Sequence, residues 1–375
     1  MSDRLTEEDV ARLLSDPSVE SRASLTPKLA GQIDTEGLSD RARAMAEDII
    51  RRLSADASDL VRTTLAENLK MSPHVPRDVA RQLASDIDSV SMPILEYSSV
   101  LTQDDLVELV AQASEDGQVA VARRTDLNDT VADALLDRAS GRVAETIAEN
   151  TSAPLGDTVL GRIADEHGSS TSVSQSLKSR PALSATVAER LVARMSDHLS
   201  KVLTERQALP ESVATDLVLN ARERATLSIA SSEADRELLG LVEQLKRAGR
   251  LSPSLLFRAV CVGDTGFFEA GIATLASIPV HNARVLIYDQ GKVAFRRLYD
   301  KAALPERLFP AFRMAVDLVN DTDMRSADFD PQSYSRMMME RVLTQASDLH
   351  PEEADYLLGR LLDIAPGTTD SRPSN

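Results

Sequence analysis

A repeat of 26–28 residues is the feature of this sequence that most constrains its fold. Six apolar anchor residues are separated by 26, 26, 28, 28 and 26 residues: Val75, Leu101, Leu127, Leu155, Leu183 and Leu209. Apolar residues recur four and eight positions after these anchors, with Asp105 as the exception, and six positions before them, with Glu149 as the exception. Such a period is typical of proteins that stack one small structural unit many times.

The spacing within each unit predicts helices. An anchor and the residues four and eight positions later share one face of a helix with 3.6 residues per turn. Helix-start residues such as Asn128, Ser184 and Pro210 lie between the columns. Upstream, residues 142–150 and 198–206 predict a second, shorter helix. Because one helical hairpin cannot bury its apolar face alone, the sequence predicts an all-α protein containing an α-solenoid of HEAT-like helical hairpin repeats.

The columns also assign residues to the interior and to the surface. Val159, Val187 and Val213 stand at the same position of three units, so we expect them to be equivalent core residues. Asp129 and Glu189 stand between the columns, where we expect polar side chains that tolerate replacement by alanine.

The distribution of aromatic residues predicts more than one domain. Tyr97 is the only aromatic residue before position 257, whereas eleven others follow it. Charge is uneven as well, since residues 1–150 contain 16 basic and 29 acidic side chains. We predict an N-terminal helical cap over residues 1–55, HEAT-like repeats over 56–232, a C-terminal helical domain over 233–364 and a disordered tail over 365–375.

Composition excludes several classes of protein. A net charge of −17 disfavours nucleic-acid binding, which needs an excess of Lys and Arg. The single cysteine excludes a disulfide framework and a cysteine-based zinc site. The N-terminal sequence is acidic and lacks signal-peptide features, and no apolar run approaches the roughly 20 residues that cross a bilayer. We therefore expect a cytoplasmic protein without membrane insertion.

Several short segments resemble a known family. They are residues 245–256 (LKRAGRLSPSLL), 263–270 (GDTGFFEA), 298–299 (LY), 303–305 (ALP) and 309–312 (FPAF). These segments resemble the alphaproteobacterial domain-of-unknown-function 2336 family, and residues 61–68 resemble the opening of HEAT-like and leucine-rich-variant repeats. The resemblance implies an all-helical repeat protein of the bacterial cytoplasm and assigns no catalytic residue.

No catalytic, metal or cofactor site is predicted from the residues themselves. The five histidines are dispersed, and Cys261 lies in an apolar segment where a free cysteine is usually a small core residue. Residues 263–266 (GDTG) lack the remainder of a phosphate-binding loop. We expect them to form a turn between helices, with Asp264 capping the second one.

Basic residues are concentrated between positions 246 and 313, which hold eleven basic and five acidic side chains together with most of the aromatic residues. Arginine next to aromatic rings suits the binding of anions or acidic partners. It equally suits a seam between domains, where arginine pairs with acidic residues of the strongly acidic segment 1–150. The candidate binding residues, called the basic cluster below, are Arg247, Arg250, Arg258, Lys292, Arg296 and Arg297.

Three classes of function remain. The first is a non-enzymatic scaffold or adaptor that binds a protein partner through the helical-repeat surface. The second is a receptor module that binds an anionic small ligand, such as a nucleotide second messenger, at the C-terminal domain. A HEAT-like nucleic-acid glycosylase is a remote third, since it needs basic grooves and stacking aromatic residues within the repeats.

Overall fold

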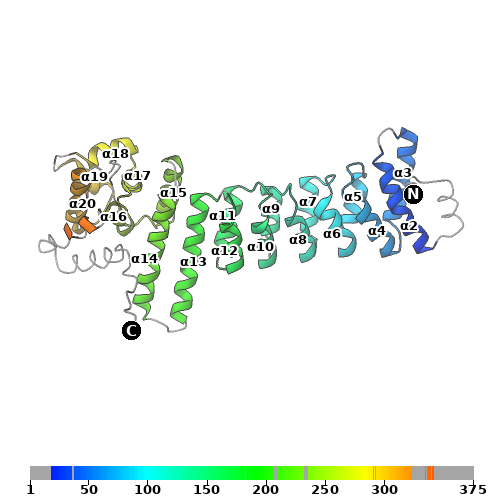
Figure 1. Ribbon diagram of the computed structural model, residues 1–375, viewed down its shortest axis with the longest axis horizontal. Coiled ribbons are helices and arrows are strands. Elements are labelled where there is room, and N and C mark those ends of the chain that lie inside the picture. The colour runs from blue at the N-terminus through cyan, green and yellow to red at the C-terminus, as the bar shows by residue number, and fades with distance from the viewer. Residues whose placement is uncertain are drawn as a thin grey trace, which may run out of the picture. The chain divides into compact units, whose positions relative to one another are not determined.

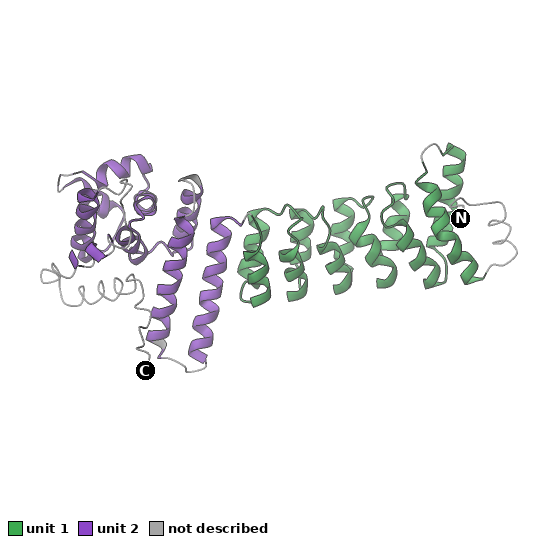
Figure 2. Ribbon diagram, in the orientation of Figure 1, with its two compact units in different colours: residues 1–182 green, residues 183–375 purple. Residues whose placement is uncertain are grey.

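The chain divides into two compact units, residues 1–182 and 183–375 (Figure 2). The computed structural model describes residues 18–35, 38–181, 183–205, 210–231, 235–289, 291, 293–322, 334, 336–338 and 340–341. These residues form helices and no strand, which confirms the all-α class. The predicted boundary after residue 232 falls inside the second unit, and the predicted tail, residues 365–375, lies outside the described residues.

The first unit is a stack of helices in two layers (Figure 1). One layer contains α2 (Val19–Ile33), α4 (Asp59–Leu69), α6 (Asp88–Tyr97), α8 (Glu115–Ala122), α10 (Gly141–Glu149) and α12 (Thr171–Lys178). The other contains α3 (Asp40–Ser54), α5 (Arg77–Ala84), α7 (Gln103–Val110), α9 (Asp129–Leu136) and α11 (Asp157–His167). Each helix of the first layer packs on the next one of that layer and on helices of the second layer. This arrangement confirms the predicted helical repeats.

The apolar columns form the core of this stack. The residues four positions after the anchors are buried in the first unit, from Val79 to Val159. The predicted start signal Asn128 caps α9, since its side chain accepts a hydrogen bond from the backbone N–H of Val131 at 3.0 Å. Local periodicity and capping were therefore sufficient to place these helices.

Asp105 replaces an apolar residue of the column and is nevertheless fully buried. Its carboxylate lies 2.7 Å from Nε of Arg77 and 2.7 Å from Nη1 of Arg81, both on the preceding helix of the same layer. It also forms a capping box with Thr102 at the start of α7. The hydrogen bond from Arg77 is the main reason that the pKa of Asp105 lies far below its usual range. The exception to the repeat is thus a stabilised ion pair between neighbouring repeats.

A second polar link between repeats lies at the C-terminal ends of the first-layer helices. Arg124, after α8, donates hydrogen bonds of 2.9 Å to the carbonyl oxygens of Leu95 and Ser98. Asn150, after α10, donates to the carbonyl of Arg124 at 2.7 Å, and Arg180 donates to that of Asn150 at 2.9 Å. Because the last carbonyls of a helix have no partner within it, each of these side chains completes the helix end one repeat earlier.

The second unit begins with a long helical hairpin and continues as an irregular bundle. The hairpin consists of α13 (Ala185–Glu205) and α14 (Glu211–Ala230), which pack against each other. The bundle contains α15 (Asp235–Arg247), α16 (Pro253–Val262), α17 (Thr265–Ala276), α18 (Val280–Ile287), α19 (Ala294–Lys301), the short 3₁₀ helix η1 (Glu306–Leu308) and α20 (Phe309–Asp321). Its core is rich in rings, including Phe267, Phe268, Phe295, Tyr299 and Phe312, all fully buried.

The hairpin overturns two expectations from the repeat. Residues 198–206 were expected to form a separate short helix, but α13 continues without a break to Glu205. Val213 was expected in the core and is 49% exposed, whereas Ala214 and Val218 are buried. The reason is geometric. In the 20-residue helix α14 the buried face contains the residues one position later in the sequence, and Val213 lies about 100° around the helix from Ala214. The repeat register therefore ends before the sixth unit.

Among the described helices, none is by itself both long and apolar enough to span a bilayer. The pair α17 and α18 meets these criteria only when the two are taken together, and the chain bends by 108° between them.

Candidate functional site

The basic cluster is not a single surface. Arg247 is exposed at the end of α15, Arg297 is exposed on α19, and Lys292 lies outside the described residues. The remaining three members, Arg250, Arg258 and Arg296, each form ion pairs within the second unit.

Arg250 pairs with a buried glutamate of the hairpin. Its Nη1 atom lies 2.8 Å from Oε1 of Glu189, and Gln244 donates to Oε2 of Glu189 at 3.0 Å. Burial raises the pKa of Glu189, while the charge of Arg250 and the hydrogen bond from Gln244 act in the opposite direction. Glu189 is fully buried, so the expectation that it is a tolerant surface position was wrong. It holds α13 to the segment after α15.

Arg258 is the most deeply buried member of the cluster and pairs with Glu223 on α14. The distance from Nε of Arg258 to Oε2 of Glu223 is 3.1 Å, and both side chains are almost inaccessible to solvent. Arg258 also donates to Oδ1 of Asn220 at 3.0 Å, and Ser254 donates to Oε2 of Glu223 at 3.1 Å. Arg250 and Arg258 thus form an internal seam that links the hairpin to the bundle, but their acidic partners belong to the second unit, so the expectation that these arginines pair with residues 1–150 was wrong. The repeat spacing did not indicate which acidic residues pair with these two arginines, because Glu189 and Glu223 are 61 and 35 residues away along the chain.

The aromatic residues of this region are core residues and do not form an exposed stacking surface. Phe257 and Phe312 meet edge to face with ring centroids 5.3 Å apart, and Tyr299 lies 5.4 Å from Phe312. One cation–ring contact is present, since the guanidinium of Arg296 lies 4.8 Å from the ring centroid of Phe309. Arg296 also pairs with Asp300 and Glu306. Its charge is therefore already balanced.

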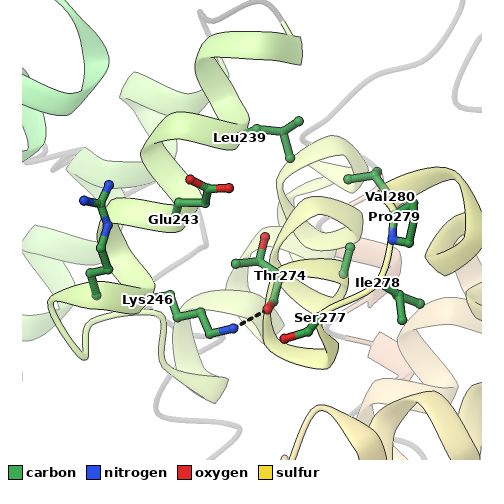
Figure 3. A pocket seen from close by; sticks show the side chains of 10 residues that line it. Leu239, Glu243, Lys246, Thr274, Ser277, Ile278, Pro279 and Val280 are labelled. Atoms are coloured by element: carbon green, nitrogen blue, oxygen red, sulfur yellow. Dashed lines mark hydrogen bonds between the residues drawn. The ribbon is translucent and has the colours of Figure 1, made fainter.

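Two exposed basic residues line a cavity of about 530 Å³ between α15, α17 and the start of α18 (Figure 3). Lys246 and Arg247 come from α15, and the Lys246 ammonium donates to the Thr274 carbonyl oxygen at 2.5 Å. Ser277 lies across from Lys246, and Glu243 contributes a carboxylate to the same wall. Leu239 and other apolar residues complete the lining, so the cavity combines cationic, hydroxyl and apolar groups with one carboxylate.

A second cavity of about 450 Å³ lies along α18 and α19. Arg297 and Lys301, one helical turn apart on α19, are its cationic residues. Leu286 and Val293 are among its apolar residues, and Asp289 adds one acidic side chain. Of the basic cluster, Arg247 and Arg297 are therefore exposed beside cavities, and they lie in different ones.

The described residues contain no group of three or more His, Cys, Asp or Glu side chains suited to a metal ion. Cys261 is fully buried, and burial raises the pKa of its thiol. Asp264 accepts a hydrogen bond of 3.0 Å from the backbone N–H of Phe267. This contact confirms that Asp264 caps α17, but only Gly263 and Asp264 lie between the two helices, because α17 already begins at Thr265.

The first unit carries an exposed patch that the repeat pattern did not reveal. Tyr97, the only aromatic residue before position 257, is 46% exposed at the end of α6. Lys70 places its ammonium 5.0 Å from the ring centroid, and the adjacent Met71 is 68% exposed. The neighbouring Glu96 carboxylate raises the pKa of the Tyr97 phenol, whereas the charges of Lys70 and of Arg123, which is exposed after α8, act in the opposite direction. We call Lys70, Met71, Tyr97 and Arg123 the Tyr97 patch.

The spacing of the Tyr97 patch could have been found in the sequence. Met71, Tyr97 and Arg123 are separated by 26 residues each, so they occupy equivalent positions after or at the ends of α4, α6 and α8. These helices are consecutive neighbours in one layer. The columns used to find the repeat were apolar and buried, whereas this column is exposed.

Comparison with known proteins places the chain in a family. No curated protein and no solved structure matches it. The model of a family described as "Uncharacterised protein conserved in bacteria (DUF2336)" matches residues 90–351, which include repeats of the first unit and most of the second. The chain belongs to the bacterial DUF2336 family.

Proposed function

We propose that this protein is a cytoplasmic scaffold or adaptor that binds a protein partner through the helical-repeat surface of its first unit. The observation that carries the proposal is the exposure of Tyr97. The interiors of the described repeats are filled with aliphatic side chains, so the ring is not needed for packing. Tyr97 together with the exposed Met71 and Arg123 has the composition of an interface centre, since Tyr, Met and Arg are enriched there.

The test is affinity capture followed by calorimetry with the purified partner. Full-length wild-type chain serves as bait in an extract of a bacterium that encodes it, and bound proteins are identified by mass spectrometry. Replacement of Tyr97 by alanine is expected to weaken binding of the partner at least about tenfold, because truncation of a central aromatic residue typically costs more than 1 kcal/mol. The melting temperature should not change, because the ring fills no core position.

Met45→Ala is the matched control. Met45 is a large exposed apolar residue of the same unit, on α3 and outside the Tyr97 patch. The Met45→Ala variant should bind the partner with the same affinity as the wild type. Equal affinity of wild type and the Tyr97→Ala variant for every captured protein would reject the Tyr97 patch as the binding surface.

A second candidate function is the recognition of an anionic small ligand in the cavity between α15, α17 and α18. It is favoured by the placement of Lys246 and Arg247 beside Thr274 and Ser277 in a space of about 530 Å³. Cavities of this size hold small organic ligands. Cationic and hydroxyl donors beside apolar groups suit a nucleotide, which has phosphates and a flat base.

Thermal unfolding with cyclic mononucleotides and dinucleotides tests this second candidate. A ligand at 100 times its Kd stabilises the folded state by about 2.7 kcal/mol, so a binder should raise the melting temperature clearly. The Lys246→Glu and Arg247→Glu double variant should lose the increase, whereas Arg307→Glu, at an exposed basic residue away from the cavity lining, should keep it. A nucleotide-induced increase that persists in the double variant would contradict this site.

A further inference from the structure

The α13–α14 hairpin is much longer than its packing within the chain requires. Its helices contain 21 and 20 residues, whereas those from α5 to α12 contain 8–11. The buried residues of α13 all precede position 194. The second half of α13 therefore contacts α14 but has no residue enclosed by the described part of the unit.

This outer half of the hairpin exposes large apolar side chains on both helices. Met195 and Leu199 are one turn apart on α13, and Val213 and Leu217 are one turn apart on α14. Their exposed fractions lie between 46% and 54%. We call these four residues the hairpin face.

All four residues lie on one side of the hairpin. Asp197 of α13 and Arg222 of α14 approach to 3.6 Å and bridge the two helices. At about 100° per residue, Met195 and Leu199 are each turned about 160° away from Asp197. By the same rule, Val213 and Leu217 are turned about 180° and about 140° away from Arg222. The hairpin face is therefore the side opposite this ion pair, and both helices contribute to it.

The charge of the hairpin suits contact with a second copy of the chain. Its two helices contain five basic and six acidic residues, a net charge of −1 in a chain of net charge −17. The exposed charges Arg194, Asp197 and Lys201 of α13 lie at least about 100° around the helix from Met195 and Leu199, so none of them is on the hairpin face. Two strongly acidic chains repel each other over most of their surfaces, and contact through a nearly neutral segment minimises that repulsion.

We propose that the hairpin face is a homodimer interface, in which the hairpins of two chains pack as four helices about a two-fold axis. A two-fold contact uses the same surface of both chains, and the hairpin face is apolar on both helices, with the Asp197–Arg222 ion pair on the side turned away from it. Pairing of two such hairpins covers Met195 and Leu199 of each chain with apolar side chains of the other, as in a helical bundle. This interface goes beyond the proposed scaffold function and does not depend on it.

The experiment measures the mass of the full-length chain in solution by size-exclusion chromatography with light scattering over a range of protein concentrations. The wild type is expected at twice 40.7 kDa. The Leu199→Glu and Leu217→Glu double variant is expected to dissociate, with a dimer Kd raised at least about 100-fold, because it places four charges in an apolar interface. Helix content by circular dichroism should match that of the wild type, since both positions are exposed in one chain.

Val285→Glu is the control, because Val285 is an exposed apolar residue on α18, outside the hairpin face. It should remain dimeric. A milder pair of changes, Leu199→Ser and Leu217→Ser, keeps the test valid if the glutamate variant loses helix content, and it should raise the dimer Kd in the same direction. A monomeric wild type at all concentrations would overturn the proposal, whether another segment or another protein covers the face. A dimer unaffected by both pairs of changes would overturn it equally.

Discussion

Replacement of Arg258 by alanine is expected to lower the free energy of unfolding of the second unit by about 3–5 kcal/mol. The change leaves Glu223 without its 3.1 Å partner at a position almost inaccessible to solvent. Ser252 and Ser254 still donate to that carboxylate, but hydroxyl groups do not balance its charge. Urea unfolding of the purified variant, followed by circular dichroism, measures the loss.

Two comparisons separate charge balance from side-chain size. Arg247→Ala removes an arginine of the same basic cluster from an exposed position and should change stability by less than about 0.5 kcal/mol. The double change Glu223→Leu with Arg258→Met removes both charges and retains apolar volume, so it should recover most of the lost stability. If Arg258→Ala proved as stable as Arg247→Ala, the pair would not link the hairpin to the bundle.

The pair also illustrates which parts of the structure the sequence could not predict. Helices of the first unit are encoded locally, by apolar residues at helical spacing and by caps such as Asn128. The partner of Arg258 is 35 residues away on a different helix, and no local pattern selects Glu223 among the acidic residues of the chain. The local excess of basic residues could therefore be read from the sequence. Which arginines of the basic cluster are paired and which are exposed depends on tertiary packing.

The end of the repeat has a similar explanation. Val213 and Leu217 continue the apolar columns in the sequence, yet Ala214 and Val218 are the buried residues of α14. A shift of one residue turns a helix face by about 100°, and in a long hairpin the neighbouring helix decides which face is covered. The sequence shows that Tyr97 is an isolated aromatic residue. It does not predict that the ring is exposed, because the exposure follows from the place of Tyr97 at the end of α6.

The largest loss in the first unit is expected for Val159→Asp. Val159 is fully buried on α11, and an unpaired carboxylate there should lower the free energy of unfolding by about 4 kcal/mol or more, enough to unfold the neighbouring repeats. Val285→Asp makes the same change at a residue that is 66% exposed, and it should cost less than about 1 kcal/mol. Thermal unfolding followed by circular dichroism compares the two variants.

Asp105 shows why a carboxylate at this position of the repeat is not always destabilising. It occupies the position equivalent to Val159, and Arg77 and Arg81 of the preceding repeat neutralise it. Arg77 and Arg81 stand two and six positions after the anchor Val75, and the same positions after the anchor Leu127 hold Asp129 and Asp133. Asp129 accepts a hydrogen bond from the backbone N–H of Gly156 at the start of α11, and Asp133 pairs with Arg162. A carboxylate at position 159 would therefore meet like charges where Asp105 meets arginines. If Val159→Asp retained the stability of the wild type, the equivalence of the two positions, and with it the repeat register, would be wrong.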